Sequence, residues 1–80
     1  MKLNIATPEK SLPTLEVEEV VIPTVAGETM ILPGHARLVS QLGEGSLHYR
    51  SASESKSFSI KGGVVEVHHE HILVLCDEML

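Results

Sequence analysis

The apolar residues of this chain come in short runs with a period near two, and no stretch shows helical spacing. In "KSFSIKGG", for example, Phe58 and Ile60 fall on one face of an extended segment, and Ser57 and Ser59 fall on the other. Such runs recur at roughly eight- to twelve-residue spacing, separated by Gly, Pro and Ser. This pattern predicts an all-β fold, a small sandwich or barrel.

Three local features refine this prediction. The runs "VVEV" and "ILVL" flank "HHEH", which predicts a hairpin. Gly62 and Gly63 permit a backbone bend or a positive φ. In "LEVEEVVIP" the alternation changes around Glu18 and Glu19, which indicates a bulge or a shift of burial at that point.

Length and charge limit the classes of function. Eighty residues make one domain, and its formal charge of −5, with scattered Lys and Arg, argues against nucleic-acid binding. Cys76 is the only cysteine, so no internal disulfide is possible, and its place in "ILVLC" predicts a buried small side chain. No apolar run approaches the ~20 residues of a membrane helix, and "MKLNIATPEK" lacks a signal-peptide core. We expect a soluble chain that reaches a membrane only through a partner.

The segment "HHEH" is the one candidate metal site. His68, His69 and His71 carry imidazoles that suit zinc, copper or nickel, and Glu70 adds a carboxylate. Adjacent side chains on a tight turn diverge, however, and no second ligand cluster accompanies them. We therefore favour a polar turn and expect no metal or cofactor, and we keep a small metal-binding β-sandwich module as the alternative.

Catalytic signals are weak. There is no Gly-x-Ser-x-Gly elbow and no phosphate-binding Gly-rich loop, and Asp77 is the only aspartate. Glu18 and Glu19 are expected to point to opposite faces of a strand, which makes them a poor acid–base pair. His35 follows Pro33 and Gly34 at a turn and has no obvious partner. We expect no catalytic residues; a free-standing enzyme would require a deep polar pocket.

The stretch "AGETMILPGHARLVSQL" resembles the epsilon subunit of F-type ATP synthases, which is called delta in mitochondria. The family segment typically reads Glu-Gly-Glu-Leu-Gly-Ile-Leu-Pro-Gly-His-Ala-Pro-Leu. The segments "KLNIATPEK", "VEEVVIP", "KGGVVEV" and "ILVLCDE" are also similar to the family, in the same order along the whole chain.

This resemblance implies that residues 1–80 form the family's N-terminal domain, a flattened β-sandwich of about ten short strands. It implies a non-catalytic rotor subunit of the central stalk, which joins gamma to the polar loops of the membrane c-ring and so couples ion flow to ATP synthesis. Its place would be peripheral, on the cytoplasmic face of a bacterial inner membrane. By the same resemblance, Glu28, Thr29 and Met30 lie in a ring-facing loop, and His35 lies at or near the face that meets gamma and the ring.

The chain departs from the family pattern at three points. Thr29-Met30 replaces the usual Leu-Gly in the docking loop, and Arg37 replaces a usual proline. The C-terminal hairpin of two helices, which in the family can block ATP hydrolysis and in some members binds ATP, is not expected within these 80 residues. The resemblance therefore implies coupling here, without autoinhibition or ATP sensing.

Overall fold

The computed structural model describes residues 1–80 and contains strands and loops but no helix. None of its elements is therefore a helix that could cross a bilayer. The predicted all-β class is confirmed. The strands are β1 (Lys2–Ala6), β2 (Leu15–Glu16), β3 (Glu19–Thr24), β4 (Gly27–Ile31), β5 (Leu38–Gln41), β6 (Glu44–Arg50), β7 (Ser55–His68) and β8 (His71–Met79).

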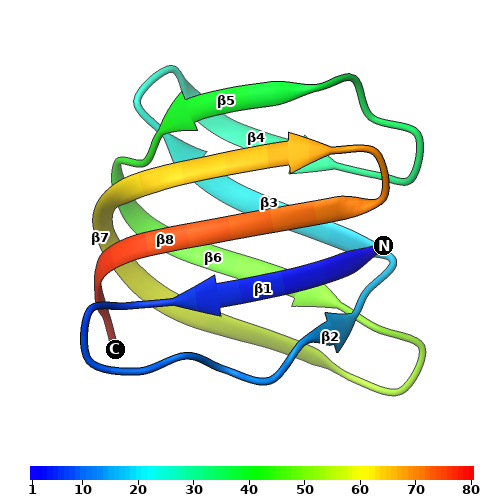
Figure 1. Cartoon of the computed structure of the whole chain (residues 1–80), viewed down its shortest axis with the longest axis horizontal. Helices are drawn as coiled ribbons and strands as arrows, with labels where there is room; N and C mark the ends of the chain where they lie inside the picture. The colour runs from blue at the N-terminus through cyan, green and yellow to red at the C-terminus, as the bar shows by residue number, and fades with distance from the viewer.

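The strands form one sheet that folds over on itself into two layers (Figure 1). We call the layer of β5, the second half of β7, β8, β1 and β2 the front layer, and the layer of β4, β3, β6 and the first half of β7 the back layer. All pairs are antiparallel except β1 with β8, which run parallel. The resulting body measures 25 × 24 × 17 Å, a flattened sandwich as expected.

Strand β7 belongs to both layers because it bends at a glycine pair. Its 14 residues pair with β6 from Ser55 to Lys61 and with β5 from Val64 to Val67, while β8 pairs with it from Ile60 to His68. Gly62 and Gly63 have φ values of 67° and 114°, as the sequence predicted for a bend at this point. This continuous strand is one reason why the chain has eight strands rather than about ten short ones; two further pairings remain isolated bridges.

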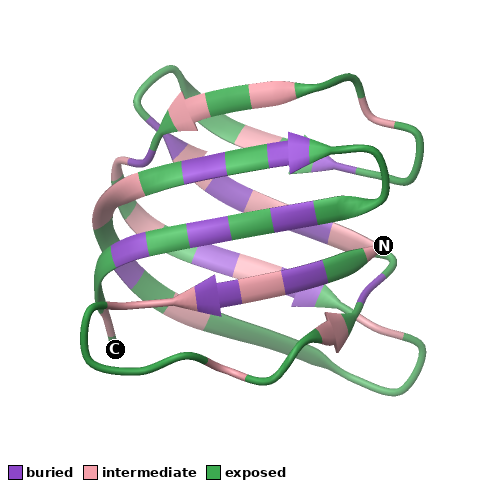
Figure 2. Cartoon of the chain, viewed as in Figure 1, coloured by how far each residue is buried: buried purple, intermediate pink, exposed green.

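The core lies between the two layers and follows the alternation in the sequence. Figure 2 shows buried and exposed residues alternating along β7 and β8. Cys76 is buried, as predicted, and its thiol donates a weak hydrogen bond to the Ala6 carbonyl oxygen at 3.7 Å. The core side chains are Leu3, Ile5, Val17, Val20, Ile22, Ile31, Leu42, Leu47, Tyr49, Ile60, Val65, Val67, Ile72, Val74 and Cys76.

The change of pattern near Glu18 marks the point where the chain crosses between layers. Strand β2 ends at Glu16 in the front layer, β3 begins at Glu19 in the back layer, and Val17 between them is buried. The predicted shift of burial is thus a crossover. The prediction that the Glu18 and Glu19 side chains point to opposite faces of a strand is wrong, because Glu18 precedes β3. Both carboxylates instead lie close to the Arg50 guanidinium, Glu18 at 2.9 Å and Glu19 at 3.9 Å.

Candidate functional site

The segment "ILPGHARL" forms a tight turn between β4 and β5. The His35 N–H donates to the Leu32 carbonyl oxygen at 3.0 Å, with Pro33 and Gly34 at the two central positions. Gly34 has a φ of 86°, which a type II turn requires at its third residue. An added Cβ at Gly34 would meet nothing within 4 Å, so the backbone angle alone calls for glycine.

The His35 side chain is held by its own turn. Its Nδ1 lies 2.6 Å from the Ala36 carbonyl oxygen, so Nδ1–H donates this bond and leaves Nε2 as an unoccupied acceptor. The ring is half-buried and has no carboxylate or nucleophile among its hydrogen-bond or ion-pair partners. This arrangement suits a fixed contact on a rigid loop better than a catalytic base.

Strand β4 separates the three residues that the family resemblance places in one loop. Met30 pairs with Val21 and is 53% exposed, and Glu28 lies two residues away on the same outer face. Thr29 pairs with the buried Ile22 and points to the opposite, core-side face. Glu28 and Met30 can therefore contact one partner together, whereas Thr29 contributes to the strand edge.

His35 does not join these residues in one compact site. The β3–β4 turn and the β4–β5 loop lie at opposite ends of β4 (Figure 1). From Glu28 to Ile31 the strand advances by about 10 Å, and the loop follows that point. The predicted interface residues thus lie along one edge of the sandwich, with exposed Leu32 at the start of the loop.

The "HHEH" segment forms the predicted β7–β8 hairpin. His68 and His71 form its last cross-strand pair, and His69 occupies the turn with a φ of 56°. The His68 and His69 rings lie 4.2 Å apart between centroids, tilted by 40°. No group of three or more His, Cys, Asp or Glu side chains is placed to hold a metal ion. The geometry therefore gives the metal-binding interpretation no support.

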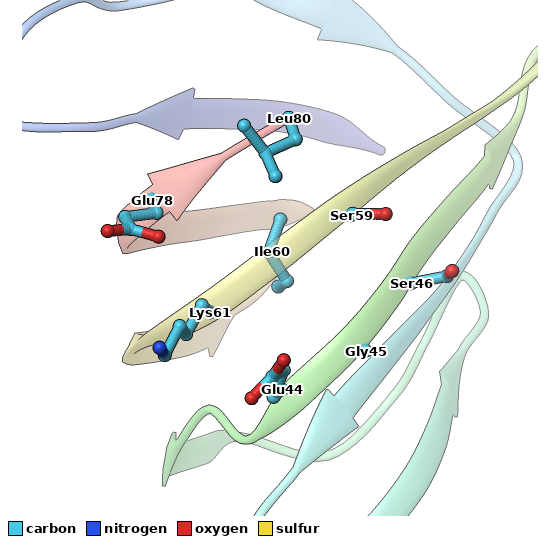
Figure 3. Close-up of a pocket in the computed structure, with 8 residues that line it drawn as sticks. All are labelled: Glu44, Gly45, Ser46, Ser59, Ile60, Lys61, Glu78 and Leu80. Carbon is cyan, nitrogen blue, oxygen red and sulfur yellow. The ribbon is translucent and has the colours of Figure 1, made fainter.

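The cavities are shallow and open. One of about 320 Å³ lies where β7 bends between β6 and β8, beside the last residue of the chain (Figure 3). Its charged lining side chains are Glu44, Lys61 and Glu78, which occupy one cross-strand row. Its two serines, Ser46 and Ser59, pair across β6 and β7, and neither hydroxyl is hydrogen-bonded to Glu44 or Glu78, so the lining shows no nucleophile activated by a base. Burial raises the pKa of the Cys76 thiol, which disfavours the thiolate that nucleophilic chemistry needs.

The sequence patterns did not predict one surface feature, a set of exposed apolar side chains. Four large apolar side chains lie exposed on the outer face of the front layer; we call Val39, Val64, Leu73 and Leu75 the apolar stripe. Their exposed fractions are 66, 43, 39 and 44%. Figure 2 shows exposed segments alternating with buried or half-buried ones along β5, β7 and β8 on the front layer. The sequence does contain a sign of this surface: apolar residues stand at the outward positions of alternating strands, where polar side chains are usual.

Comparison with known proteins gives a consistent result. A family model described as the ATP synthase delta/epsilon chain, beta-sandwich domain, matches residues 1–80. The ATP synthase epsilon chain of Solibacter usitatus is 40% identical over 77 residues, which cover 96% of this chain and 58% of that relative. The epsilon chain of Leptospira interrogans is 39% identical over 77 residues, with coverage of 96% and 61%. The chain thus spans little more than half the length of the curated relatives it matches.

Two solved structures share the fold. A chain in the Euglena gracilis mitochondrial ATP synthase structure of OSCP, F1 and c-ring matches with a TM-score of 0.91 and 25% identity, over 98% of this chain and 51% of that one. A chain in the central stalk and c-ring structure of the Tetrahymena thermophila mitochondrial ATP synthase matches with a TM-score of 0.86, over 99% and 64%. The identity to the second is 21%, so that match supports the fold alone.

Proposed function

The chain belongs to the β-sandwich domain family of ATP synthase delta and epsilon chains, and from this premise we propose that it acts in the rotor of a rotary F-type ATP synthase. In this role it joins the gamma subunit to the polar loops of the membrane c-ring. Rotation driven by ion flow through the ring then reaches the catalytic head. The chain itself makes and breaks no bond.

The observation that carries this proposal is the ordered match of the whole chain to one family. The rigidity of the fold also suits a coupling element. A flattened sandwich with β7 shared by both layers transmits torque without an internal hinge, because both layers are parts of one hydrogen-bonded sheet. The proposal covers coupling alone, because the resemblance assigns autoinhibition and ATP sensing to a helical hairpin and the elements of residues 1–80 are all strands.

We assign the ring contact to the outer face of β4. Glu28 and Met30 share that face, and an exposed carboxylate beside an apolar side chain can pair with a basic loop while covering apolar surface. Thr29 shapes the edge between them. His35 stands at the far end of β4 on the rigid turn, where we assign a contact with gamma or the ring.

The proposed place of the chain is peripheral, at the cytoplasmic face of a bacterial inner membrane, and it is held there by its partners. A partner-dependent location fits the acidic surface of the domain, because a net charge of −5 is repelled by anionic lipid headgroups. Attachment would therefore be lost when the gamma and c-ring contacts are broken.

Co-purification with recombinant gamma tests the proposal. Wild type is compared with His35→Glu, and Ala52→Glu serves as the charge control because Ala52 is an exposed residue of the loop between β6 and β7. We expect wild type and the control to bind and His35→Glu to bind more weakly. If His35→Glu bound gamma as well as wild type does, we would conclude that the loop faces the ring or the solvent. Failure of wild type to bind gamma would refute the rotor role.

The ring contact has a separate test. Glu28→Lys reverses the charge on the outer face of β4 without touching the core. We expect this variant to retain gamma but to release the c-ring when the complex is washed at low ionic strength, where a charge contact is strongest. Glu54→Lys, on the Ser51–Glu54 loop between β6 and β7, is the matched control. Equal retention of the ring by both variants would contradict the assignment of Glu28.

A further inference from the structure

Residue Met1 is held from two sides at the start of β1. Figure 1 places it between the β7–β8 hairpin and the crossover from β2 to β3. Its α-ammonium donates to the Val17 carbonyl oxygen at 3.0 Å, and the Val17 N–H donates back to the Met1 carbonyl oxygen at 2.8 Å. On the other side, the Lys2 N–H donates to the Glu70 carbonyl oxygen at 2.8 Å. A terminal residue is usually poorly ordered unless it is tied down, so these bonds make Met1 a part of the fold.

The Met1 side chain is also part of the core. It packs against the buried cluster and is 2% exposed. A chain that began at Lys2 would lose this apolar burial. It would also carry a charged α-amine at the nitrogen that now bonds to Glu70 as a backbone amide. The structure therefore uses Met1 both for packing and for its amine.

The α-ammonium of Met1 lies among three oxygen atoms, and an ammonium has three N–H donors. Besides the Val17 carbonyl oxygen, the carboxylates of Glu16 and Glu70 lie 3.2 and 4.0 Å away. These carboxylates are 74% and 59% exposed, so each ion pair is screened and weak by itself. The bond to Val17 is partly buried, and a charge-assisted bond is about twice as strong as a neutral one. The carbonyl is therefore the main partner of the amine, and the carboxylates reinforce it.

An acyl group on the Met1 nitrogen does not suit these surroundings. Formylation or acetylation turns the ammonium into a neutral amide with one N–H and adds a carbonyl oxygen. The amide N–H can still donate to Val17, but the charge assistance is lost. The carboxylates of Glu16 and Glu70 then face a further acceptor in place of a cation. The site thus favours a free amine over a blocked one.

We propose that Met1 is a processing site: the stable fold requires that Met1 is retained with its α-amine free. In a chain whose synthesis begins with N-formylmethionine, hydrolysis must supply this amine. Water breaks the bond between the formyl carbon and the nitrogen, formate leaves, and the nitrogen takes up the protons of the ammonium. Because the Met1 side chain is buried in the folded domain, this reaction acts on the chain before β1 docks. The inference concerns the domain by itself and does not depend on a stalk partner.

Chemical synthesis of residues 1–80 allows a direct test. Three forms are compared, with the Met1 amine free, formylated or acetylated. The matched control has a free Met1 amine and a formyl group on the side-chain amine of Lys10, an exposed residue whose side chain forms no ion pair. This control loses the same positive charge at a position that contacts no part of the Met1 site. Urea denaturation followed by circular dichroism gives the midpoint of each form.

We expect both Met1-blocked forms to unfold at about 1 M less urea than the free form, the order expected when a charge-assisted bond becomes neutral. The Lys10 control should lie within about 0.2 M of the free form. Equal midpoints for the free and the Met1-blocked forms would overturn the inference. An equal fall in the Lys10 control would also overturn it, because net charge alone would then explain the loss.

The carboxylates are tested by the double change Glu16→Gln with Glu70→Gln, made in the free and in the formylated form. Both positions are exposed, so the variants should fold. We expect the difference in midpoint between the free and the formylated form to become smaller, because the amides neither attract the ammonium nor repel the formyl oxygen. A difference that stays the same or grows would contradict the charge argument.

Peptide mapping tests the processing itself. The untagged chain is made in a bacterial host, and its soluble, folded fraction is digested with a protease that cleaves after glutamate. We expect mass spectrometry to find the peptide Met1–Glu9 with an unmodified α-amine as the main N-terminal species. A main species that is formylated, acetylated or without Met1 would overturn the inference.

Discussion

Replacing Gly62 by alanine should lower the free energy of unfolding far less than replacing Gly63 by alanine, although the two glycines are adjacent in the bend of β7. Gly62 has a φ of 67°, in the left-handed region that other residues can adopt at some cost, and its added Cβ would meet only the flexible carboxylate of Asp77. Gly63 has a φ of 114°, outside that region. Its Cβ would lie 2.7 Å from the Cys76 Cα and closer still to the Leu75 carbonyl oxygen.

The expected magnitudes follow from these contacts. Gly62→Ala should lower the free energy of unfolding by about 1 kcal/mol, the cost of a left-handed residue. Gly63→Ala adds a backbone clash to a strained φ, and relieving it must separate β7 from β8 at the Gly63–Cys76 pair. We expect a loss of about 3 kcal/mol or more. Against a total of about 4 to 12 kcal/mol for a domain of this size, that loss is a large fraction.

Urea denaturation followed by far-ultraviolet circular dichroism measures both losses. With a slope of about 1 kcal/mol per molar, the midpoint should fall by about 1 M for Gly62→Ala and about 3 M for Gly63→Ala. Gly43→Ala is the control, because its Cβ would make only ordinary contacts, the nearest at 3.4 Å, and its φ is not positive. Equal shifts for Gly62→Ala and Gly63→Ala would refute the claim that backbone contact at Gly63 fixes the bend.

Three further outcomes are expected. Leu47→Ala, at a fully buried position, should lower the free energy of unfolding by about 2 to 5 kcal/mol in urea melts. Arg50→Gln removes the 2.9 Å contact with half-exposed Glu18 and should cost less than about 1 kcal/mol, a difference that added salt erases. Burial, with a smaller contribution from Asp77, raises the pKa of the Cys76 thiol, although its backbone hydrogen bond opposes this. Above about pH 9.0 the unfolded thiol ionises first, so urea midpoints should fall as the pH rises, and Cys76→Ala should remove this slope.

The alternation of the sequence predicted most of the local structure correctly. Ile60 is buried between the exposed Ser59 and Lys61, the hairpin turns at His69, and the glycine pair bends β7. These features depend on side-chain period and backbone freedom, both of which are encoded within a few residues. The type II turn at Pro33 and Gly34 was predictable for the same reason.

Features set by distant segments were not predictable from local pattern. The parallel pairing of β1 with β8 joins residues some seventy positions apart, as in the pair of Lys2 with His71. The membership of β7 in both layers likewise depends on where β5 and β6 meet it. Strand register also determines which of the predicted interface side chains face outward. Thr29 points to the core side because it pairs with the buried Ile22, and no sequence motif reveals that pairing.

The apolar stripe shows why a surface is harder to infer than a core. In the run "ILVLC", every residue is apolar, so the pattern reads equally well as a strand buried on both faces. The structure instead buries Val74 and exposes Leu73 and Leu75, because no element covers the front layer from outside. Exposed leucines add nothing to the stability of the isolated domain, whereas covering them would stabilise a complex. The outward apolar positions are therefore best explained by a partner that covers them.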